Sequence, residues 1–185
     1  MSYSLEGYEE ERQKWRNFKR ERPAEIVTPG PGQESVWDYP RPPRVEPVDR
    51  RIRVEFGGIV LAETERAYRV IETSSPPAYY VPPQDVEMAY LVATDHKTFC
   101  EWKGVAKYWS VRVGERFVEH GAWSYPEPDE GFEVIRDYVA FFPGRMDACY
   151  VGEQRVMPQP GGYYGGWVTP DIVGPFKGEP GTENW

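Results

Sequence analysis

The residues best suited to chemistry gather in one stretch, 98–113, which reads TFCEWKGVAKYWSVRV. It places a thiol, a carboxylate and an amine together at Cys100, Glu101 and Lys103, directly before Gly104. A lysine beside a glycine can meet an anion closely, because the glycine has no side chain in the way. A cysteine beside a cation can act as a nucleophile through its thiolate. We therefore expect a site at this stretch, with Lys103 as the charge contact and Cys100 as a candidate nucleophile.

Other candidates lie at the ends of predicted strands, where a rigid sheet can hold functional side chains. Glu72 is a candidate acid or base, although pairing with an arginine would give it a structural role instead. Small polar ligands are commonly held by a few charged groups within aromatic walls. The predicted ligand contacts are Arg69, Tyr108, Trp123 and Tyr125.

A metal site is not expected. His96, Cys100, His120 and Cys149 nominally suffice for tetrahedral zinc, but the chain has no paired Cys-x-x-Cys motif. The alternative interpretation is that both cysteines are small buried hydrophobic residues. Cys149 in particular lies within an apolar predicted strand. We expect no cofactor.

Composition narrows the class of protein. The net charge of −8 argues against nucleic-acid binding, which needs clustered Lys and Arg. No apolar run approaches the ~20 residues that span a bilayer. The first fifteen residues lack the pattern of a secretory signal, so we expect a cytoplasmic protein with reduced cysteines. An aromatic content of 15%, with 19 Pro and 18 Gly, predicts a ring-rich core with many turns.

Four segments are predicted along the chain. Residues 1–22 form a charged arm, either an exposed helix or a flexible docking arm, that adds little to stability. Residues 23–49 form a proline-rich strap or linker, since 23–47 holds seven prolines. Residues 50–157 form the β-rich core domain, and 158–185 an aromatic, glycine-rich tail packed on it.

The core pattern favours strands. From Val105 to Val113 large residues alternate with period two, and 116–125 supplies a partner strand. Residues 51–56 and 59–62 flank Gly57-Gly58 as a hairpin, and 145–151 forms a later strand. Residues 88–92 are expected as a short strand followed by a turn at 94–95. The prolines of 74–83 argue against regular structure there. Apolar residues at helical spacing predict a helix over 130–142, capped by Asp129.

Several phrases resemble the bacterial family catalogued as domain of unknown function 427. They are VWDYPRPPR, RAYRVIETSSPPAYYVPPQDV, FCEWKGVAKYW, AWSYPEP, YVAFFPGRMDACYV and GGWVTPDIVGPFKGEPGT. The resemblance covers the chain from about Ser35 onward. It implies a compact β-structure of the Mss4-like or β-tent kind and carries the label of a nucleotidyltransferase, but implies no catalytic residues. The Asp-x-Asp pair common in that enzyme class, the phosphate-binding G-x-x-x-x-G-K-[ST] loop and G-x-G-x-x-G are all missing from the sequence.

The sequence thus predicts a mainly β (α+β) protein, a compact curled antiparallel sheet with one helix packed on it and an extended wrapping tail. The leading functional hypothesis is a domain that binds a small polar or anionic molecule in an aromatic-lined pocket, with nucleotidyl transfer or another enzymatic activity left open. The alternative is a non-catalytic protein-interaction module. A homo-oligomer fits either hypothesis, and neither a nucleic acid nor a membrane is an expected partner.

Overall fold

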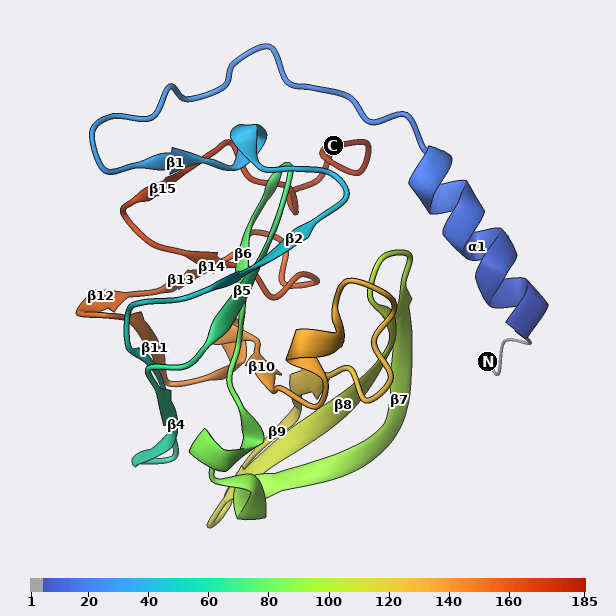
Figure 1. Cartoon of the computed structure of the whole chain (residues 1–185). Coiled ribbons are helices and arrows are strands. Elements are labelled where there is room, and N and C mark those ends of the chain that lie inside the picture. Colours follow the sequence, from blue (N-terminus) through green and yellow to red (C-terminus); the bar gives the residue numbers. More distant parts are fainter. Residues whose placement is uncertain (1–4) are drawn as a thin grey trace.

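The fold is described from a computed structural model and covers residues 5–185 (Figure 1). The chain is mainly β, which confirms the predicted fold class, but the strands form several small sheets rather than one curled sheet. Pairing within these sheets is antiparallel except between two short strands, β1 (Glu34–Ser35) and β15 (Ile172–Val173). Single-turn 3-10 helices connect the strands at Val36–Asp38, Pro83–Asp85, Met88–Tyr90, Glu133–Ile135 and Pro143–Arg145.

The largest strands form a four-stranded sheet in the order β10-β9-β8-β7. Its members are β7 (Leu91–Cys100), β8 (Gly104–Val113), β9 (Arg116–Ser124) and β10 (Ala140–Phe141). The predicted strand over 105–113 and its partner over 116–125 are thereby confirmed. The predicted turn at 94–95 is wrong: those residues continue β7, whose register against β8 shifts between Ala93 and Lys97. Such a bulge lets a strand carry turn-forming residues without ending.

A second four-stranded sheet has the order β12-β11-β3-β4. It contains β3 (Ile52–Phe56), β4 (Ile59–Thr64), β11 (Ala148–Val151) and β12 (Gln154–Arg155). The predicted hairpin is confirmed, because Gly57 and Gly58 both adopt positive φ angles between β3 and β4. Two positive φ angles in a two-residue turn match the twist of the flanking strands.

The third sheet joins β2 (Arg44–Pro47), β5 (Tyr68–Glu72) and β6 (Ser75–Tyr80) in the order β2-β5-β6. The prediction that 74–83 lacks regular structure is wrong, since β6 falls within it. Pro76 and Pro77 are tolerated because β6 is an edge strand of this sheet and its register with β5 shifts between Val70 and Glu72. A final pair is β13 (Met157–Pro158) with β14 (Trp167–Val168).

Three apolar clusters hold the sheets together. The largest packs β3, β4 and β11 against β8 and β9, around Val54, Leu61 and Val111. The second is rich in aromatic rings and includes Tyr80, Trp123 and Tyr125. The third seats Val36 and Trp37 of the strap against Ile71 and Ile172. The strap at 34–47 and the tail therefore pack on the sheets (Figure 1).

The predicted helix over 130–142 is wrong. Gly131 and Asp137 have positive φ angles, which a right-handed helix does not allow, and only Glu133–Ile135 makes a helical turn. The apolar residues that suggested the helix are divided between cores: Val139 packs in the largest cluster, and Phe132 in the aromatic one.

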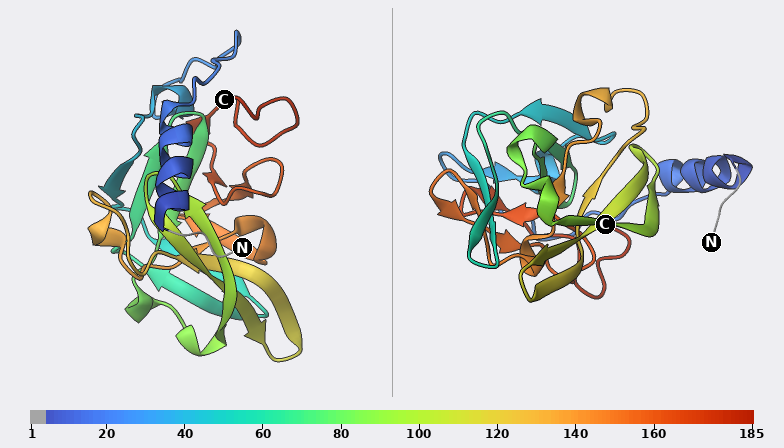
Figure 2. Two further views of the ribbon diagram at one scale, coloured as in Figure 1. Left: turned by 90° about the vertical axis from the view of Figure 1, so that its right-hand side faces the viewer. Right: turned by 90° about the horizontal axis from the view of Figure 1, so that it is seen from below.

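Helix α1 (Leu5–Asn17) lies in the predicted charged arm, whose first four residues fall outside the described part of the chain. It stands beside the tip of the β7–β8 hairpin and projects from the body (Figure 2). Arg12 pairs with Asp129, Arg16 donates to the main-chain oxygen of Glu101 at 2.9 Å, and the rings of Tyr8 and Phe99 lie 4.9 Å apart. Of the two alternatives for this arm, the structure shows a helix, docked by charged contacts. No described helix has the length and apolar character needed to cross a membrane.

Candidate functional site

The stretch around Lys103 forms the tip of the β7–β8 hairpin. Cys100 ends β7 and pairs with Gly104 at the start of β8, which leaves Glu101, Trp102 and Lys103 in the turn. Gly104 has a φ of +89, and a β-carbon there would lie 3.1 Å from a carboxylate oxygen of Asp129. Glycine is therefore required for this turn. The backbone N–H of Asp129 donates to the carbonyl oxygen of Lys103 at 3.1 Å and holds the tip in place.

The turn between β5 and β6 gathers two distant segments around Glu72. The backbone N–H of Thr73 donates to the carbonyl oxygen of Pro40 at 3.3 Å, which brings Arg41 of the strap to this turn. The N–H of Lys177 donates to the carbonyl oxygen of Ser74 at 2.9 Å, which brings the tail there as well. These two backbone hydrogen bonds therefore bring Arg41 and Lys177 close to Glu72, which lies at the end of β5.

These elements assemble six charged side chains, which we call the Glu72 cluster: Arg20, Arg41, Glu72, Glu101, Lys103 and Lys177. Arg41 forms ion pairs with both Glu72 and Glu101, the latter at 3.1 Å. Arg20 approaches Glu101 at 3.5 Å and donates to the main-chain oxygen of Trp185 at 2.8 Å, to which Lys177 also donates at 3.1 Å. Glu72 is near enough to Lys103, Lys177 and Arg20 to influence the ionisation of all three.

Positive charge is in excess in the Glu72 cluster. Four of its members are basic, and only Glu72 and Glu101 are acidic, although the whole chain carries a net charge of −8. Within residues 5–185, no Asp or Glu side chain forms an ion pair with Lys103 or Lys177. The buried Nε of Arg20 has no hydrogen-bond acceptor among the same residues. The cluster therefore has donors available to a further acceptor.

Burial and mutual repulsion appear in the pKa values of two members. The pKa of Lys177 is lowered to about 8, chiefly by burial and then by the positive charge of Arg20. The pKa of Arg20 is also lowered, by burial and by Arg41, with Glu72 and Glu101 opposing the shift. A bound anion would raise both pKa values, because an additional negative charge nearby favours the charged form of each group.

Lys103 points inward from the hairpin tip. Its ammonium lies 5.7 Å from the centre of the Tyr125 ring, and the residue is half-buried. Burial alone would lower the pKa of Lys103, but neighbouring Cys100, Tyr125, Tyr80 and Glu72 outweigh it, and the pKa is raised well above its ordinary value. Burial also raises the pKa of Tyr125, against the effect of Lys103. The pair at neutral pH is therefore an ammonium against a protonated phenol.

The predicted aromatic walls are brought together, but two of them are buried. Trp123 and Tyr125 are 7% and 5% exposed and pack in the aromatic cluster, with half-buried Tyr108 and Cys100 against it. The indole N–H of Trp123 donates to the hydroxyl of Tyr80 at 3.3 Å. Only Tyr108, whose hydroxyl lies 3.0 Å from that of Thr98, keeps a larger exposed surface. These rings therefore form a packed aromatic cluster, and Lys103 lies against one of them, Tyr125.

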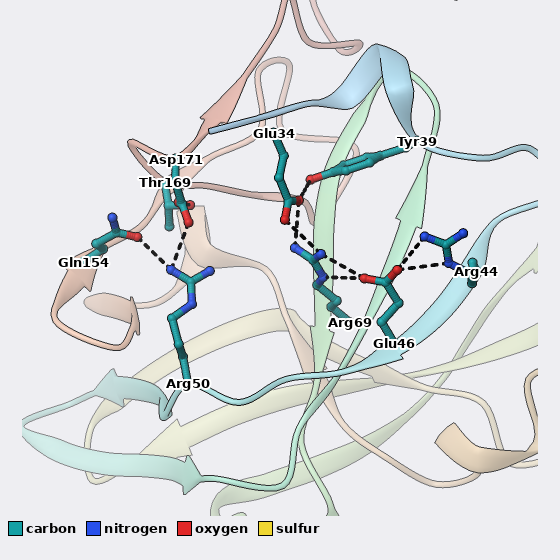
Figure 3. A network of polar contacts seen from close by, with 9 residues as sticks. All are labelled: Glu34, Tyr39, Arg44, Glu46, Arg50, Arg69, Gln154, Thr169 and Asp171. Carbon is teal, nitrogen blue, oxygen red and sulfur yellow. Dashed lines mark hydrogen bonds and ion pairs between the residues drawn. The ribbon is translucent and has the colours of Figure 1, made fainter. Parts of the chain in front are cut away.

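Arg69, predicted as a ligand contact, lies in a separate network (Figure 3). Its guanidinium donates to both carboxylate oxygens of Glu34, at 3.0 and 3.1 Å, and to Glu46 at 2.8 Å. Burial lowers the pKa of Arg69, but these two carboxylates outweigh burial and raise it overall. Its hydrogen-bonding capacity is therefore used within the fold.

The four residues considered for zinc are dispersed. The rings of His96 and His120 stack at 4.5 Å beside Tyr108, while Cys149 is buried in the largest core cluster, where burial raises its pKa. Cys100 lies at the hairpin tip, its sulfur 3.9 Å from a carboxylate oxygen of Glu101. In the part of the chain that the structure describes, no group of three or more His, Cys, Asp or Glu side chains could hold a metal ion.

Three basic residues of the Glu72 cluster were missed by the sequence analysis: Arg20, Arg41 and Lys177. Arg20 lies in the charged arm, Arg41 in RPPR and Lys177 in GPFKG. None of these segments has a periodic hydrophobic pattern. Periodicity cannot place such residues on a face. For Arg41 and Lys177 the available signal was that both phrases belong to the family resemblance; Arg20 lies outside it.

A shallow groove of about 490 Å³ lies elsewhere, between the strap and the tail. It is lined by Glu25, Ile26, Val27, Gly174, Pro175 and Phe176. None of the predicted site residues lines it.

Comparison with known proteins places the chain in a family. No curated protein matches it. A family model described as domain of unknown function (DUF427) matches residues 44–152, which includes β2 to β11, the hairpin tip and Glu72. Arg20, Arg41 and Lys177 lie outside the matched range. Because the match spans more than half of the sequence, the chain belongs to the DUF427 family.

Proposed function

We propose that the protein binds a small anionic molecule at the Glu72 cluster. The observation that carries the proposal is the excess of basic groups there: Arg20, Arg41, Lys103 and Lys177 surround only two carboxylates in an otherwise acidic chain. Partly buried cations attract an anion more strongly than surface ones, because solvent screens them less.

The four cations have different roles in this proposal. Arg41 is already held by Glu72 and Glu101, so its guanidinium is fixed in orientation before a ligand arrives. Lys103 and Lys177 supply charge that no Asp or Glu side chain in residues 5–185 neutralises by an ion pair. Arg20 offers its unpartnered Nε. Pre-organised donors lower the entropic cost of binding, which is the physical advantage of building such a site into a fold.

Isothermal titration calorimetry with sulfate tests the proposal, since sulfate keeps its charge over the whole neutral range. The wild-type chain should bind sulfate saturably, and Lys103→Met should weaken binding by about tenfold or more, which corresponds to ~1.4 kcal/mol. Urea unfolding shows whether Lys103→Met is folded under the conditions of the titration, since the raised pKa of Lys103 means that its ammonium contributes to stability. The matched control is Lys107→Met, which removes a lysine of β8 that also lies over a ring, at 4.4 Å from Trp109.

Two results would contradict the proposal. One is a wild-type protein that shows no saturable heat with sulfate at constant ionic strength. The other is an equal loss of affinity in Lys103→Met and Lys107→Met, which would indicate a general effect of net charge rather than a site.

A further inference from the structure

We propose that Tyr163 and Tyr164 complete this site and bind a planar aromatic ring, so that its ligand is an anionic group attached to such a ring. The inference rests on the proposed function and narrows its ligand class. It starts from the sequence GGYYGG at 161–166, in which two adjacent tyrosines stand between two glycine pairs.

The two tyrosine rings are unusually exposed to solvent. Tyr163 is 74% exposed and Tyr164 37% exposed, whereas the other tyrosines and tryptophans among residues 5–185 are buried or half-buried. Their ring centres lie 4.9 Å apart at an interplanar angle of 86°. The edge-to-face pair leaves ring surface exposed to solvent, where a flat partner can cover it.

Contacts place these rings at the Glu72 cluster. The ammonium of Lys177 lies 5.6 Å from the centre of the Tyr164 ring. Tyr164 is also near enough to Arg20, Glu72 and Glu101 for each to affect its ionisation. Tyr163 is near enough to Tyr108 to affect its ionisation. The two tyrosines therefore lie beside both the Glu72 cluster and half-buried Tyr108.

The base of the loop is fixed, so the rings are held at this position. A β-carbon on Gly165 would come within 2.2 Å of the Trp123 ring, which means that the backbone lies directly on that indole. The backbone N–H of Gly166 donates to Gln159 at 3.2 Å, and the amide of Gln159 donates to the carbonyl oxygen of Lys177 at 2.7 Å. One side chain thus connects the tyrosine loop to the basic tail.

The chemistry of the two halves defines the ligand. The basic half recognises a negative charge, and the tyrosine half recognises a flat π-surface. Aromatic side chains stack on a flat ring far better than on a puckered aliphatic ring of similar size. The anionic group could be a phosphate, a sulfonate or a carboxylate, and the probes below separate these.

The test compares benzenesulfonate with cyclohexanesulfonate, which carry the same charge on a flat and on a puckered ring. For the wild type we expect benzenesulfonate to bind about three- to tenfold more tightly. Tyr163→Ala and Tyr164→Ala should abolish that preference while leaving sulfate affinity within about twofold. Phe117→Ala is the control, since Phe117 is 48% exposed but lies near the opposite end of the same sheet, at the β8–β9 turn. Phenyl phosphate and benzoate, titrated alongside, identify the preferred anionic group.

The outcomes separate the two proposals. If sulfate binds but the two sulfonates bind equally, the aromatic inference is overturned and the anion site stands. If the preference survives in both tyrosine variants, the ring is recognised elsewhere and the inference is again overturned. If neither sulfate nor any sulfonate binds, the proposed function itself fails.

Discussion

The Glu72 cluster and the network around Arg69 are built from the same residue types but differ in charge balance. In the Arg69 network, two arginines, Arg44 and Arg69, are bound by two carboxylates, Glu34 and Glu46, and nearby Arg50 is bound separately by Asp171 (Figure 3). The hydroxyl of Tyr39 also donates to Glu34 at 2.6 Å. In the Glu72 cluster four basic residues share two carboxylates.

The difference separates a structural network from the proposed binding site. The Arg69 network fixes the strap to β5, the Arg50–Asp171 pair fixes the tail to the segment before β3, and a further ligand would have to displace contacts already made. The Glu72 cluster joins arm, strap, hairpin tip and tail as well, yet it leaves donors without acceptors among the described residues. Arg69 was predicted as a ligand contact from its residue type alone, and residue type does not distinguish these two situations.

The largest effect on stability is expected for a substitution that disrupts the charge-balanced Arg69 network. Arg69→Met leaves Glu34 and Glu46 facing each other across a partly buried site, which should lower the free energy of unfolding by roughly 2–4 kcal/mol. The loss is measured by urea unfolding. Sulfate affinity of the folded variant should remain that of the wild type. A stable Arg69→Met variant that has lost sulfate binding would reverse the roles that we assign to the two regions.

The next effect concerns pH and Lys177, whose pKa is lowered to about 8. Its ammonium is present below that pH and lost above it, so sulfate affinity should fall several-fold between pH 7 and pH 9, and Lys177→Gln should bind weakly with little pH dependence over this range. Calorimetry in buffers of matched ionic strength measures the change.

Stability should respond in the opposite direction. In the window from about 8 to the ordinary lysine value of 10.5, the unfolded chain holds a proton at Lys177 that the folded chain has released. The free energy of unfolding of the wild type should therefore rise with pH in that window relative to Lys177→Gln. A parallel pH profile in the two proteins would contradict the shifted pKa.

The smallest effect concerns the docked arm. Arg12 of α1 pairs with Asp129, which in turn holds the hairpin tip, and both side chains are partly exposed. A double-mutant cycle of Arg12→Ala and Asp129→Ala should give a coupling energy of about 0.5–1 kcal/mol, the range of exposed ion pairs. A coupling near zero would mean that α1 does not dock through this pair. The sequence alone predicted an arm of little consequence for stability, and this cycle measures how much it adds.

The predictable parts of this fold are those where one local rule acts alone. Alternation located β8, for which β9 was predicted as the partner strand, and a Gly-Gly pair located the β3–β4 turn. The candidate site at the hairpin tip was predicted in part, because Cys100 and Lys103 lie close together in sequence and Glu72 ends a predicted strand. The structure places all three near one another.

The unpredictable parts depend on long-range contacts. The apolar residues of 130–142 have helical spacing, but positive φ angles at Gly131 and Asp137 break the helix. The apolar side chains of this segment therefore pack into two different clusters. Pro76 and Pro77 occupy a strand because a register shift removes the need for their missing donors. Arg41 and Lys177 reach Glu72 only through backbone hydrogen bonds to the β5–β6 turn, about which neither RPPR nor GPFKG carries local information.

The central claim is that the Glu72 cluster, and not the Arg69 network, is open to an anion. The most direct measurement follows the side-chain Nε–H resonances of arginine by ¹H–¹⁵N NMR during a sulfate titration, with assignments from single substitutions. The account predicts saturable shifts for Arg20 and Arg41, with one common dissociation constant, and unchanged resonances for Arg50 and Arg69. Shifts of similar size in all four arginines, or shifts confined to Arg50 and Arg69, would contradict it.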